Sequence, residues 1–429
     1  MLKLIFTQLW NRKRSNIWLS FELLLVFCLI WYMVDSFFVL NYNLNIPNGR
    51  NMDHTWQIAV KEYSSKSPNY REEANNPEVR EANYARILQT IRNYPGVESL
   101  GISFSGSSPG SGSYQGRGFA NPDDSTKMSS GQMITIDPET DFFQVFRYSS
   151  GKDKAPVSVK DFDWTVPNGV VVCNKFAETL FPGENAVGKE LASGHSPDAA
   201  RFIILGIVNS TKRFHYERPQ YTFYFSRRID ASNIAYLEIS VRITTSDKLF
   251  REKFVKEMTP MLQIGNFYLE RVRSYNDIEA DMNNAFGMTN YVRVQVALMT
   301  FFLLNIILCV IGTFWYRVNV RREEIGLRKA MGSTKEGIRN NLILEGLCLL
   351  AIVLIPAMII EYQFVHAGLI ETLGQRDNNL GYLPDKTLLR FFITNGITWL
   401  LMATVVTLAI WLPATKAAEM EAADALRDE

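Results

Sequence analysis

Apolar residues are concentrated in four blocks of this chain, and three of the blocks are long enough to predict membrane-spanning helices. Residues 294–316 and 391–412 contain no charged side chain. At about 1.5 Å of rise per residue, each of these blocks can cross a hydrocarbon core of roughly 30 Å. The block at 342–360 has one acid, Glu345, and one proline, Pro356, which membrane helices tolerate. The predicted spans are residues 291–317, 342–360 and 388–412.

The first apolar block is shorter and supports two interpretations. Its charge-free part, residues 23–34, lies between Glu22 and Asp35 and follows a basic start. A stretch of this length is typical of a signal-peptide core as well as of the centre of a span. No Ala-x-Ala cleavage site follows, because the first alanine of the chain is Ala59. We predict an uncleaved first span at residues 17–40, with a cleaved signal peptide as the alternative.

Lysine and arginine in the flanks of the spans predict their orientation. Residues 1–16 contain four basic residues and no acid, and the connection at 318–341 is also rich in arginine and lysine. The loop at 361–387 has only Arg376 and Lys386. The prediction places residues 1–16, 318–341 and 413–429 in the cytoplasm, and residues 41–290 and 361–387 outside.

The N-terminal segment has an amphipathic pattern of its own. Leu2, Ile5, Phe6, Leu9 and Trp10 fall on one helical face, next to a basic run. A helix of this kind lies in the membrane interface, so residues 1–16 are predicted to contact membrane lipid.

The insertion, residues 41–290, alternates between segments with helix and strand periodicity. An apolar stripe predicts a helix at 77–93, and the strand 97–104 follows it. We therefore predict a four-helix transmembrane bundle plus a large mixed α/β extracytoplasmic domain of two subdomains, the inner one at roughly 137–215. The remaining predicted helices are 174–180 and 246–261, and the remaining predicted strands are 133–136, 170–173, 201–209, 221–225 and 235–243.

Charge and cysteine content exclude several classes of protein. The 45 basic and 44 acidic residues give a formal net charge of +1, without the excess of basic residues that nucleic-acid binding needs. Four histidines and four cysteines leave little for a metal site or a disulfide scaffold. Only Cys173 falls in the insertion, so no internal disulfide is expected there. No catalytic residue, metal or bound cofactor is predicted for this chain, and we do not expect it to be an enzyme.

Two glycine-containing segments partly match phosphate-binding loops. Residues 183–190 come close to a Walker A motif, but Glu190 stands where the motif has the serine or threonine that binds Mg²⁺. This segment also follows a predicted helix instead of a strand, and we interpret it as a turn with a helix-capping or sheet-linking role. The Gly/Ser-rich segment 106–118 lacks the spacing of a phosphate loop and is predicted to be a mobile loop.

The connection between the second and third spans is too structured for a plain loop. Residues 321–341 have the pattern of a charged helix-turn-helix. Ile325, Leu327, Ala330 and Met331 give it a small apolar surface among charged neighbours. Such a surface suits the docking of a soluble partner, and a solvated linker is the alternative.

Charged residues inside spans cost free energy, which makes Glu345 and Glu22 candidate functional residues. The alternative for both is a side chain that extends to the aqueous interface near the end of its helix.

The segment Arg321–Ile338, with the sequence RREEIGLRKAMGSTKEGI, resembles the cytoplasmic motif of MacB/FtsX-type permeases of the type VII ABC superfamily. Leu344-Glu345-Gly346 matches the Leu-Glu pair that opens the third span of that family. Asp424-Ala-Leu-Arg427 resembles its C-terminal motif, and residues 174–189 are similar to its MacB-type periplasmic core. The departures are Ser333, where alanine is commoner, and Asp424 in place of glutamate.

The resemblance implies a permease of the bacterial inner membrane that has no ATPase domain of its own. Its partners would be a cytoplasmic ABC ATPase dimer, which holds ATP and Mg²⁺, and a second permease subunit, either a copy or a different chain. ATP-driven closure would be transmitted through the spans to the outer domain, which is called mechanotransmission. MacB-like systems add a periplasmic adaptor and an outer-membrane channel. The coupling residues that the resemblance implies are Arg321, Arg322, Glu324, Ile325, Gly326, Arg328, Lys329, Ala330 and Gly332.

The resemblance leaves several functions open. An insertion of about 250 residues favours efflux of a periplasmic substrate, with lipoprotein release and FtsX-like regulation of cell-wall hydrolases as alternatives. FtsX-type insertions are smaller, which counts against the last. A membrane-anchored sensor is the alternative from another class, and its missing feature is an output module in the short cytoplasmic segments.

Overall fold

The computed structural model describes residues 13–151, 153–194, 199–244, 247–367 and 387–419. The chain divides into two compact units. The helical unit contains the chain up to Tyr42 and from Thr289 onward, and the inserted domain is Asn43–Met288.

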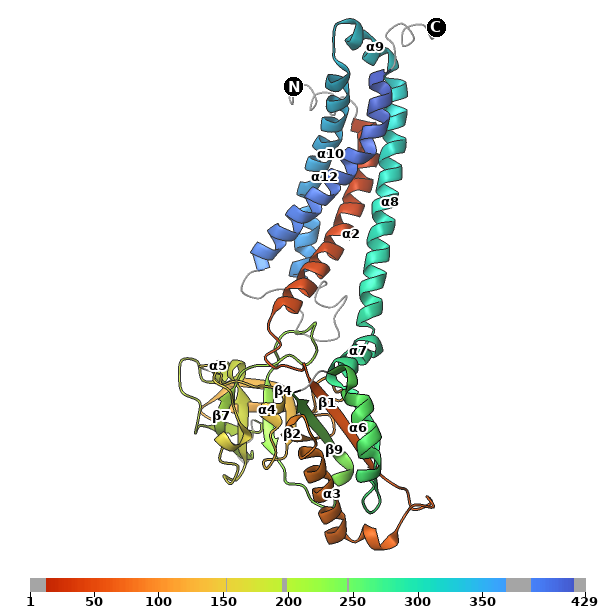
Figure 1. Ribbon diagram of the computed structural model, residues 1–429. Helices are drawn as coiled ribbons and strands as arrows, with labels where there is room; N and C mark the ends of the chain where they lie inside the picture. The colour runs from red at the N-terminus through yellow and green to blue at the C-terminus, as the bar shows by residue number, and fades with distance from the viewer. Residues whose placement is uncertain (1–12, 152, 195–198, 245–246, 368–386, 420–429) are drawn as a thin grey trace. The chain divides into compact units, whose positions relative to one another are not determined.

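Four long helices make up the helical unit, and each is long and apolar enough to cross a membrane. In Figure 1 they run alongside one another. The third begins at Lys335, before the predicted start at residue 342, and continues through Pro356. Of the predicted amphipathic segment at residues 1–16, residues 1–12 lie outside the described residues. The four helices are α2 (Lys13–Asn45), α8 (Met288–Val320), α10 (Lys335–His366) and α12 (Thr387–Glu419).

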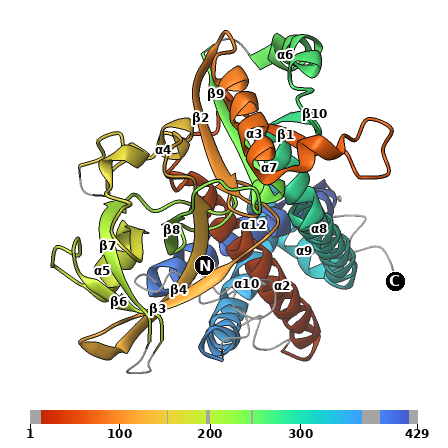
Figure 2. The ribbon, with the colours of Figure 1, turned by 90° about the horizontal axis from the view of Figure 1, so that it is seen from below.

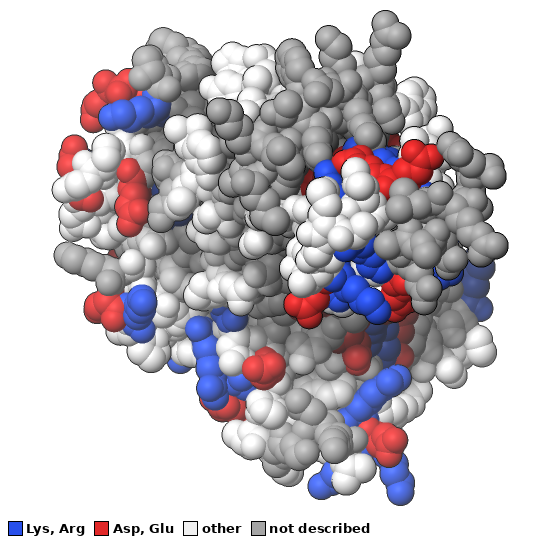
Figure 3. Space-filling model, turned by 90° about the horizontal axis from the view of Figure 1, so that it is seen from above, with Lys and Arg blue, Asp and Glu red and all other residues white. Residues whose placement is uncertain are grey.

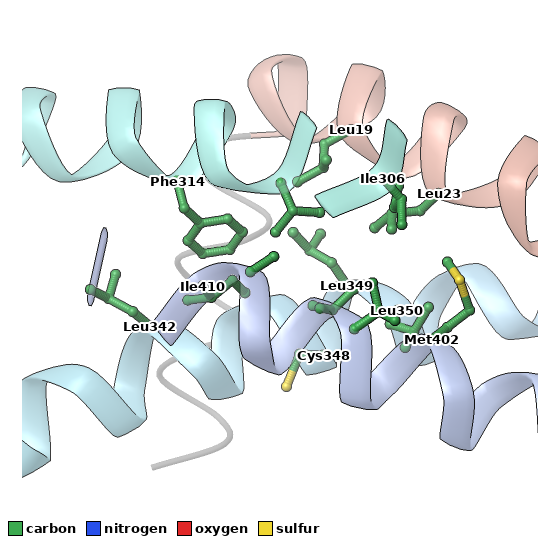
Figure 4. Packing of buried hydrophobic residues seen from close by; sticks show 14 of the residues in the cluster. Leu19, Leu23, Ile306, Phe314, Leu342, Cys348, Leu349, Leu350, Met402 and Ile410 are labelled. Carbon is green, nitrogen blue, oxygen red and sulfur yellow. The ribbon is translucent and has the colours of Figure 1, made fainter. Parts of the chain in front are cut away.

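Apolar side chains from all four helices pack into one core of the helical unit, as Figure 4 shows. Leu23 of α2, Phe314 of α8, Leu349 of α10 and Ile410 of α12 are all nearly inaccessible. Close packing of this kind holds membrane helices together, because lipid tails are as apolar as the side chains. The small residues that α12 contributes to the core are Ala409, Ala414, Ala417 and Ala418.

Helix α8 leaves most of its apolar surface exposed within the helical unit. Leu308 is 71% exposed and Phe301 60% exposed, whereas Ile306 and Val310 face the core. An exposed apolar face of this length needs lipid or another protein to cover it, as expected for a membrane-spanning helix.

The inserted domain is built on a ten-stranded sheet, part of which is seen in Figure 2. The strand order is β10-β1-β9-β2-β4-β3-β6-β7-β5-β8, and β8 also pairs with β4. Six strands therefore form a closed circuit of pairings, in the spatial order β4-β3-β6-β7-β5-β8 and back to β4. The other four strands, β10, β1, β9 and β2, extend from this circuit at β4. The strands are β1 (Thr55–Glu62), β2 (Val97–Phe104), β3 (Gly116–Asn121), β4 (Asp124–Ile136), β5 (Gly169–Cys173), β6 (Glu190–Ala192), β7 (Arg201–Val208), β8 (Thr222–Ser226), β9 (Leu237–Ile243) and β10 (Phe267–Ser274).

Five α-helices and three hydrophobic clusters complete the inserted domain over its described residues. One cluster lies between α3, α6 and the open part of the sheet, and the other two involve the closed part. The two predicted subdomains, with an inner one at 137–215, are not confirmed, because one sheet links all ten strands. Cys173 is buried and free. The helices are α3 (Pro77–Arg92), α4 (Phe142–Val145), α5 (Asn174–Leu180), α6 (Asp247–Met261) and α7 (Tyr275–Ala285).

Candidate functional site: the α9 connection and its buried charge cluster

A short helix, α9 (Arg322–Ala330), forms the connection between α8 and α10. Its charge order favours a helix, with Glu323 and Glu324 in the first turn and Arg328 and Lys329 in the last. Acids near the N-terminus and bases near the C-terminus complement the helix dipole. The pair Glu324–Arg328, four residues apart with an N–O distance of 2.5 Å, adds to this preference.

A Schellman motif ends α9 and explains the glycine of the family motif. The Gly332 N–H donates to the Lys329 carbonyl at 2.9 Å, and the Ser333 N–H donates to the Arg328 carbonyl at 3.0 Å. Gly332 has a φ of +91°, a left-handed conformation that costs other residues free energy. The chain can therefore reverse direction within two residues.

Thr334 then begins α10 as its N-cap. Its hydroxyl accepts a hydrogen bond from the Gly337 N–H at 3.1 Å, which satisfies one of the amides that the first turn leaves open. The Gly-Ser-Thr part of the motif is thus a helix stop followed by a helix start. This arrangement fixes how α9 is joined to α10.

A buried cluster of three charges connects α8, the start of α9 and α10. Arg317 donates to Glu345 at 3.0 Å, and Arg321 donates to both oxygens of Glu345 at 2.7 and 3.1 Å. All three residues are less than 9% exposed. The interpretation of Glu345 as a side chain extending to the aqueous interface is therefore wrong, because its carboxylate is enclosed by two guanidinium groups.

The cluster makes α9 part of the bundle. Taking charges out of water costs several kcal/mol per ion, and bidentate pairing with a carboxylate offsets that cost. Removing one partner would leave the others uncompensated, so Arg317, Arg321 and Glu345 have to move together. Because Arg321 is the N-cap residue of α9, these hydrogen bonds attach the start of α9 to α10.

The predicted apolar surface of α9 divides between two faces. Ile325 is buried in the core of the helical unit, and Gly326 beside it is also buried. Leu327 is 54% exposed and Met331 is 73% exposed, and Ala330 lies on the exposed side with them. The prediction of one joint surface is therefore wrong for Ile325, which anchors the helix.

The remaining predicted coupling residues lie around the exposed side. Arg322 and Lys329 are half-buried and Gly332 is exposed at the turn. Viewed from the α9 end, charged side chains form small groups of mixed sign, as Figure 3 shows. The exposed part of α9 is therefore apolar in the middle with charges at its edges.

Glu22 of α2 lies against α8. The Cys309 thiol donates to a Glu22 carboxylate oxygen, with an S–O distance of 2.6 Å, and the Glu22 side chain is half-buried. The contact links α2 to α8. Glu22 and Glu345 belong to separate sets of contacts.

A second buried polar group was missed by the sequence analysis. Arg390 of α12 donates to both oxygens of Asp35 of α2, and its Nε lies 2.8 Å from Asp35 Oδ1. Beside this pair, the Trp31 indole donates to the Thr394 hydroxyl at 3.0 Å. Opposite charges at the predicted outer ends of the first and fourth spans were the only signal for this pair.

Glu361 belongs to the same end of the bundle. It was predicted to begin the outer loop 361–387, but it is a fully buried residue of α10. Its carboxyl lies next to the Asn395 and Cys28 side chains. The helix is longer than the apolar block that predicted it, which is why the loop boundary was placed too early.

In both glycine-containing segments, polar groups make contacts within the chain. Lys189 forms an ion pair with Glu184, and its ammonium lies 4.8 Å from the Phe181 ring centroid. The Gly106 and Ser108 amides donate to the Glu238 carboxylate at 3.3 and 3.1 Å. The first half of the predicted mobile loop is therefore packed against β9. Within the described residues, no group of three or more His, Cys, Asp or Glu is placed to hold a metal ion.

A cavity of about 570 Å³ lies in the inserted domain, between α3 and the segment after β4. Leu88 and Leu100 supply apolar surface, and Asp137 and Glu139 supply charge. Burial and then the nearby charge of Glu139 raise the pKa of Asp137 to about 6. The Asp137 carboxyl also accepts hydrogen bonds from Thr140 and the Glu139 amide, which identifies it mainly as a turn-forming group.

Comparisons with known proteins give the following similarities. Residues 296–422 match the family model described as FtsX-like permease C-terminal, a range that includes α9 and Glu345. The chain is similar to the crystal structure of the periplasmic region of MacB from Actinobacillus actinomycetemcomitans, with 12% identity, coverage of 57% of this chain and 98% of that chain, and a TM-score of 0.31. It is also similar to the extracellular domain of the noncanonic ABC-type transporter YknZ from Gram-positive bacteria, with 12% identity, coverage of 51% and 100%, and a TM-score of 0.29. Among curated proteins, none matches the chain.

Proposed function

We propose, from the FtsX-like permease C-terminal domain at residues 296–422, that this chain is the permease subunit of an ABC transporter whose ATPase is a separate protein. The matching family model is described as a permease domain. The observation that carries the proposal is the attachment of α9. The helix has an exposed apolar side formed by Leu327 and Met331, and its N-cap Arg321 is hydrogen-bonded to α10.

In this proposal the exposed side of α9 docks on the ATPase. ATP and Mg²⁺ are held by the ATPase dimer, and this chain binds no cofactor. When the dimer closes, the movement of α9 passes through Arg321, Arg317 and Glu345 to α8 and α10. Since α8 is continuous with the inserted domain at Met288, movement of the helix reaches that domain directly.

The proposed location is a bacterial inner membrane. The chain crosses it four times, with both termini and α9 in the cytoplasm and the inserted domain in the periplasm. Support comes from the basic flanks of the spans, because lysine and arginine are retained on the cytoplasmic side. A membrane-impermeant thiol reagent added outside should label a cysteine at Gly112 and leave one at Lys335 unlabelled. The opposite labelling would reverse the topology.

We propose efflux of a periplasmic substrate as the work done by the inserted domain. A second permease subunit completes the transporter, with a periplasmic adaptor and an outer-membrane channel as further partners. The size of the insertion, 246 residues from Asn43 to Met288, supports a substrate-handling domain. The alternative function that the sequence suggests, lipoprotein release, would use the same transmission of movement from the ATPase to the inserted domain.

Co-purification and ATPase assays test the proposal. The chain, solubilised gently from its own membrane, should bring a separate ATPase with it. Reconstitution in lipid nanodiscs should change the ATP hydrolysis rate of that ATPase relative to the ATPase alone. A chain that purifies without an ATPase, and that leaves the hydrolysis rate of added candidates unchanged, would favour the sensor alternative.

A further inference from the structure

The β7–β8 loop, residues 209–221, contains a buried lysine that the proposed function does not use. Lys212 is 1% exposed. Its ammonium donates to the Asn43 carbonyl at 2.6 Å and to the His215 carbonyl at 3.2 Å. Burial lowers the pKa of Lys212, while the nearby charge of Glu279 raises it in part. Burying an ammonium group costs free energy, so the surrounding groups must stabilise Lys212 in this position.

The Asn43 carbonyl is one of these groups. Asn43 lies in the last turn of α2, and its carbonyl accepts the Ile46 amide at 3.2 Å as well as the Lys212 ammonium. The helix dipole also favours a positive charge at this end. Lys212 therefore caps the end of the helix that contains the first predicted span, and Arg218 donates to the Asn43 side chain at 3.4 Å.

The loop also binds the residues that follow this helix, which we call the first junction (residues 43–50). The Lys212 amide donates to the Asn48 carbonyl at 3.1 Å, and the Asn48 and His215 side chains are 3.0 Å apart. Arg50 donates to the Arg213 carbonyl at 3.0 Å.

There is no room for a side chain at Gly49, the next-to-last residue of the first junction. Its φ is +76°, and a Cβ atom would lie 2.1 Å from the Ser210 carbonyl oxygen. The first junction and the β7–β8 loop are thus in direct backbone contact.

The same loop contacts the residues that precede the second span, the second junction (residues 275–287). The His215 amide donates to the Glu279 carboxylate of α7 at 3.1 Å. Phe214 is 2% exposed, and its ring centroid lies 5.1 Å from that of Phe286. Both junctions therefore contact the β7–β8 loop.

The other side of the loop is hydrogen-bonded to the start of α5 and to the segment before β5. Ser210 donates from its amide to the Asn174 side chain at 2.9 Å, and the Asn209 amide donates to the Ser149 carbonyl at 2.9 Å. The loop itself is closed by a hydrogen bond of 3.2 Å from the Gln220 amide to the Thr211 carbonyl. A displacement of either junction is therefore passed to β7 and β8, not absorbed by a free loop.

We propose that the β7–β8 loop transfers movement of the two junctions to the sheet of the inserted domain, with Lys212 as its positioning residue. The proposal rests on the proposed function, which supplies the movement. A merely structural role would make Lys212 important for stability alone. A positioning role makes it important for the response of the sheet to nucleotide.

Hydrogen exchange measured by mass spectrometry separates the two roles. The full chain is reconstituted with its ATPase in nanodiscs, and exchange of β7 and β8 is compared with and without a non-hydrolysable ATP analogue. In the wild type we expect a nucleotide-dependent difference. Lys212→Met should reduce that difference at least fivefold while the ATPase stays bound, and Lys212→Arg should largely retain it. Lys61→Met, at an exposed ion pair of β1, is the control and should leave it unchanged.

Two further variants keep the test decisive. Phe286 is 49% exposed, so Phe286→Ala should fold even if Lys212→Met does not, and it should reduce the difference about twofold. A disulfide between cysteines at positions 48 and 215, introduced with Lys212→Met, should restore the response by replacing the lost connection.

Three outcomes would overturn the proposal. The first is a full response in a folded Lys212→Met protein, and the second is a full response in Phe286→Ala when Lys212→Met does not fold. The third is an oxidised disulfide that restores stability but not the response. If the wild type binds an ATPase without any nucleotide-dependent difference in β7 and β8, transfer through the loop is wrong while the partnership stands. If no ATPase binds, the proposed function fails and the proposal fails with it.

Discussion

Arg321, the residue at which α9 begins, donates hydrogen bonds to both carboxylate oxygens of Glu345, which lies 24 positions later on α10. The contact joins the start of the α9 connection to a residue inside α10. Arg317 adds a second guanidinium to the same carboxylate. Because the cluster is buried, the Glu345 carboxylate is the counter-charge that both guanidinium groups share.

Neutralising Glu345 should therefore destabilise the helical unit. In Glu345→Gln two buried guanidinium groups lose their counter-charge, and we expect the free energy of unfolding to fall by about 3 kcal/mol. SDS titration in mixed micelles measures it. Glu336→Gln, at an exposed position in the first turn of the same helix, should change it by less than about 0.5 kcal/mol. Equal effects of the two substitutions would mean that the cluster contributes nothing specific.

Charging the exposed side of α9 should prevent ATPase binding without unfolding the chain. Met331 is 73% exposed, so Met331→Glu costs little in the free subunit, but a glutamate buried at an interface would be unpaired. We expect at least a tenfold loss of ATPase recovered by co-purification. The matched control is Met261→Glu, at an exposed methionine of the inserted domain, which should leave recovery unchanged. Loss in both variants would indicate general misfolding.

The sequence predicted the four long apolar helices and a helix in the connection at 321–341, because long apolar blocks and helix caps are local signals. It did not predict which side chains meet across helices. Glu345 was recognised as costly, but its partner Arg321 was predicted only as one of the ATPase-coupling residues. Ile325 was placed on the docking surface, although tertiary packing turns it into the core. Asp35 and Arg390 are 355 positions apart, a separation at which no periodicity applies.

The turn after α9 depends on the conformation of Gly332. Any L-residue with a side chain is disfavoured at a φ of +91°, so Gly332→Ala should lower the free energy of unfolding by about 1 kcal/mol or more. It should also weaken coupling, because the α9–α10 angle is set there. Gly312 of α8 has open space around it and no positive φ, so Gly312→Ala serves as the control. That substitution should be neutral or slightly stabilising, since alanine favours helix. A destabilising Gly312→Ala with a neutral Gly332→Ala would contradict the assignment.

The Asp35–Arg390 pair should behave as a coupled unit. Arg390 is 3% exposed and Asp35 is 1% exposed, so either single change, Asp35→Asn or Arg390→Gln, leaves a buried unpaired charge. We expect each to cost about 3 kcal/mol, and the double variant to cost clearly less than the sum. A double-mutant cycle from SDS titration gives the coupling energy. Strict additivity would show that the two side chains do not interact in the membrane.

Asp137 should give the inserted domain a measurable dependence on pH. Its pKa is raised from about 4 to about 6, chiefly by burial, so the folded state holds a proton that the unfolded state releases more easily. The stabilisation is fully present below about pH 4 and is lost as pH rises towards about 6, with no further change above. The expected loss is on the order of 2 kcal/mol, and it should disappear in Asp137→Asn. Thermal unfolding of the full chain between pH 4 and 7.5 measures it, with Glu178→Gln, at an exposed position of α5, as the control. Stability that rises with pH over this window in the wild type, relative to Asp137→Asn, would mean that Asp137 is ionised in the folded protein and that its hydrogen bonds outweigh its burial.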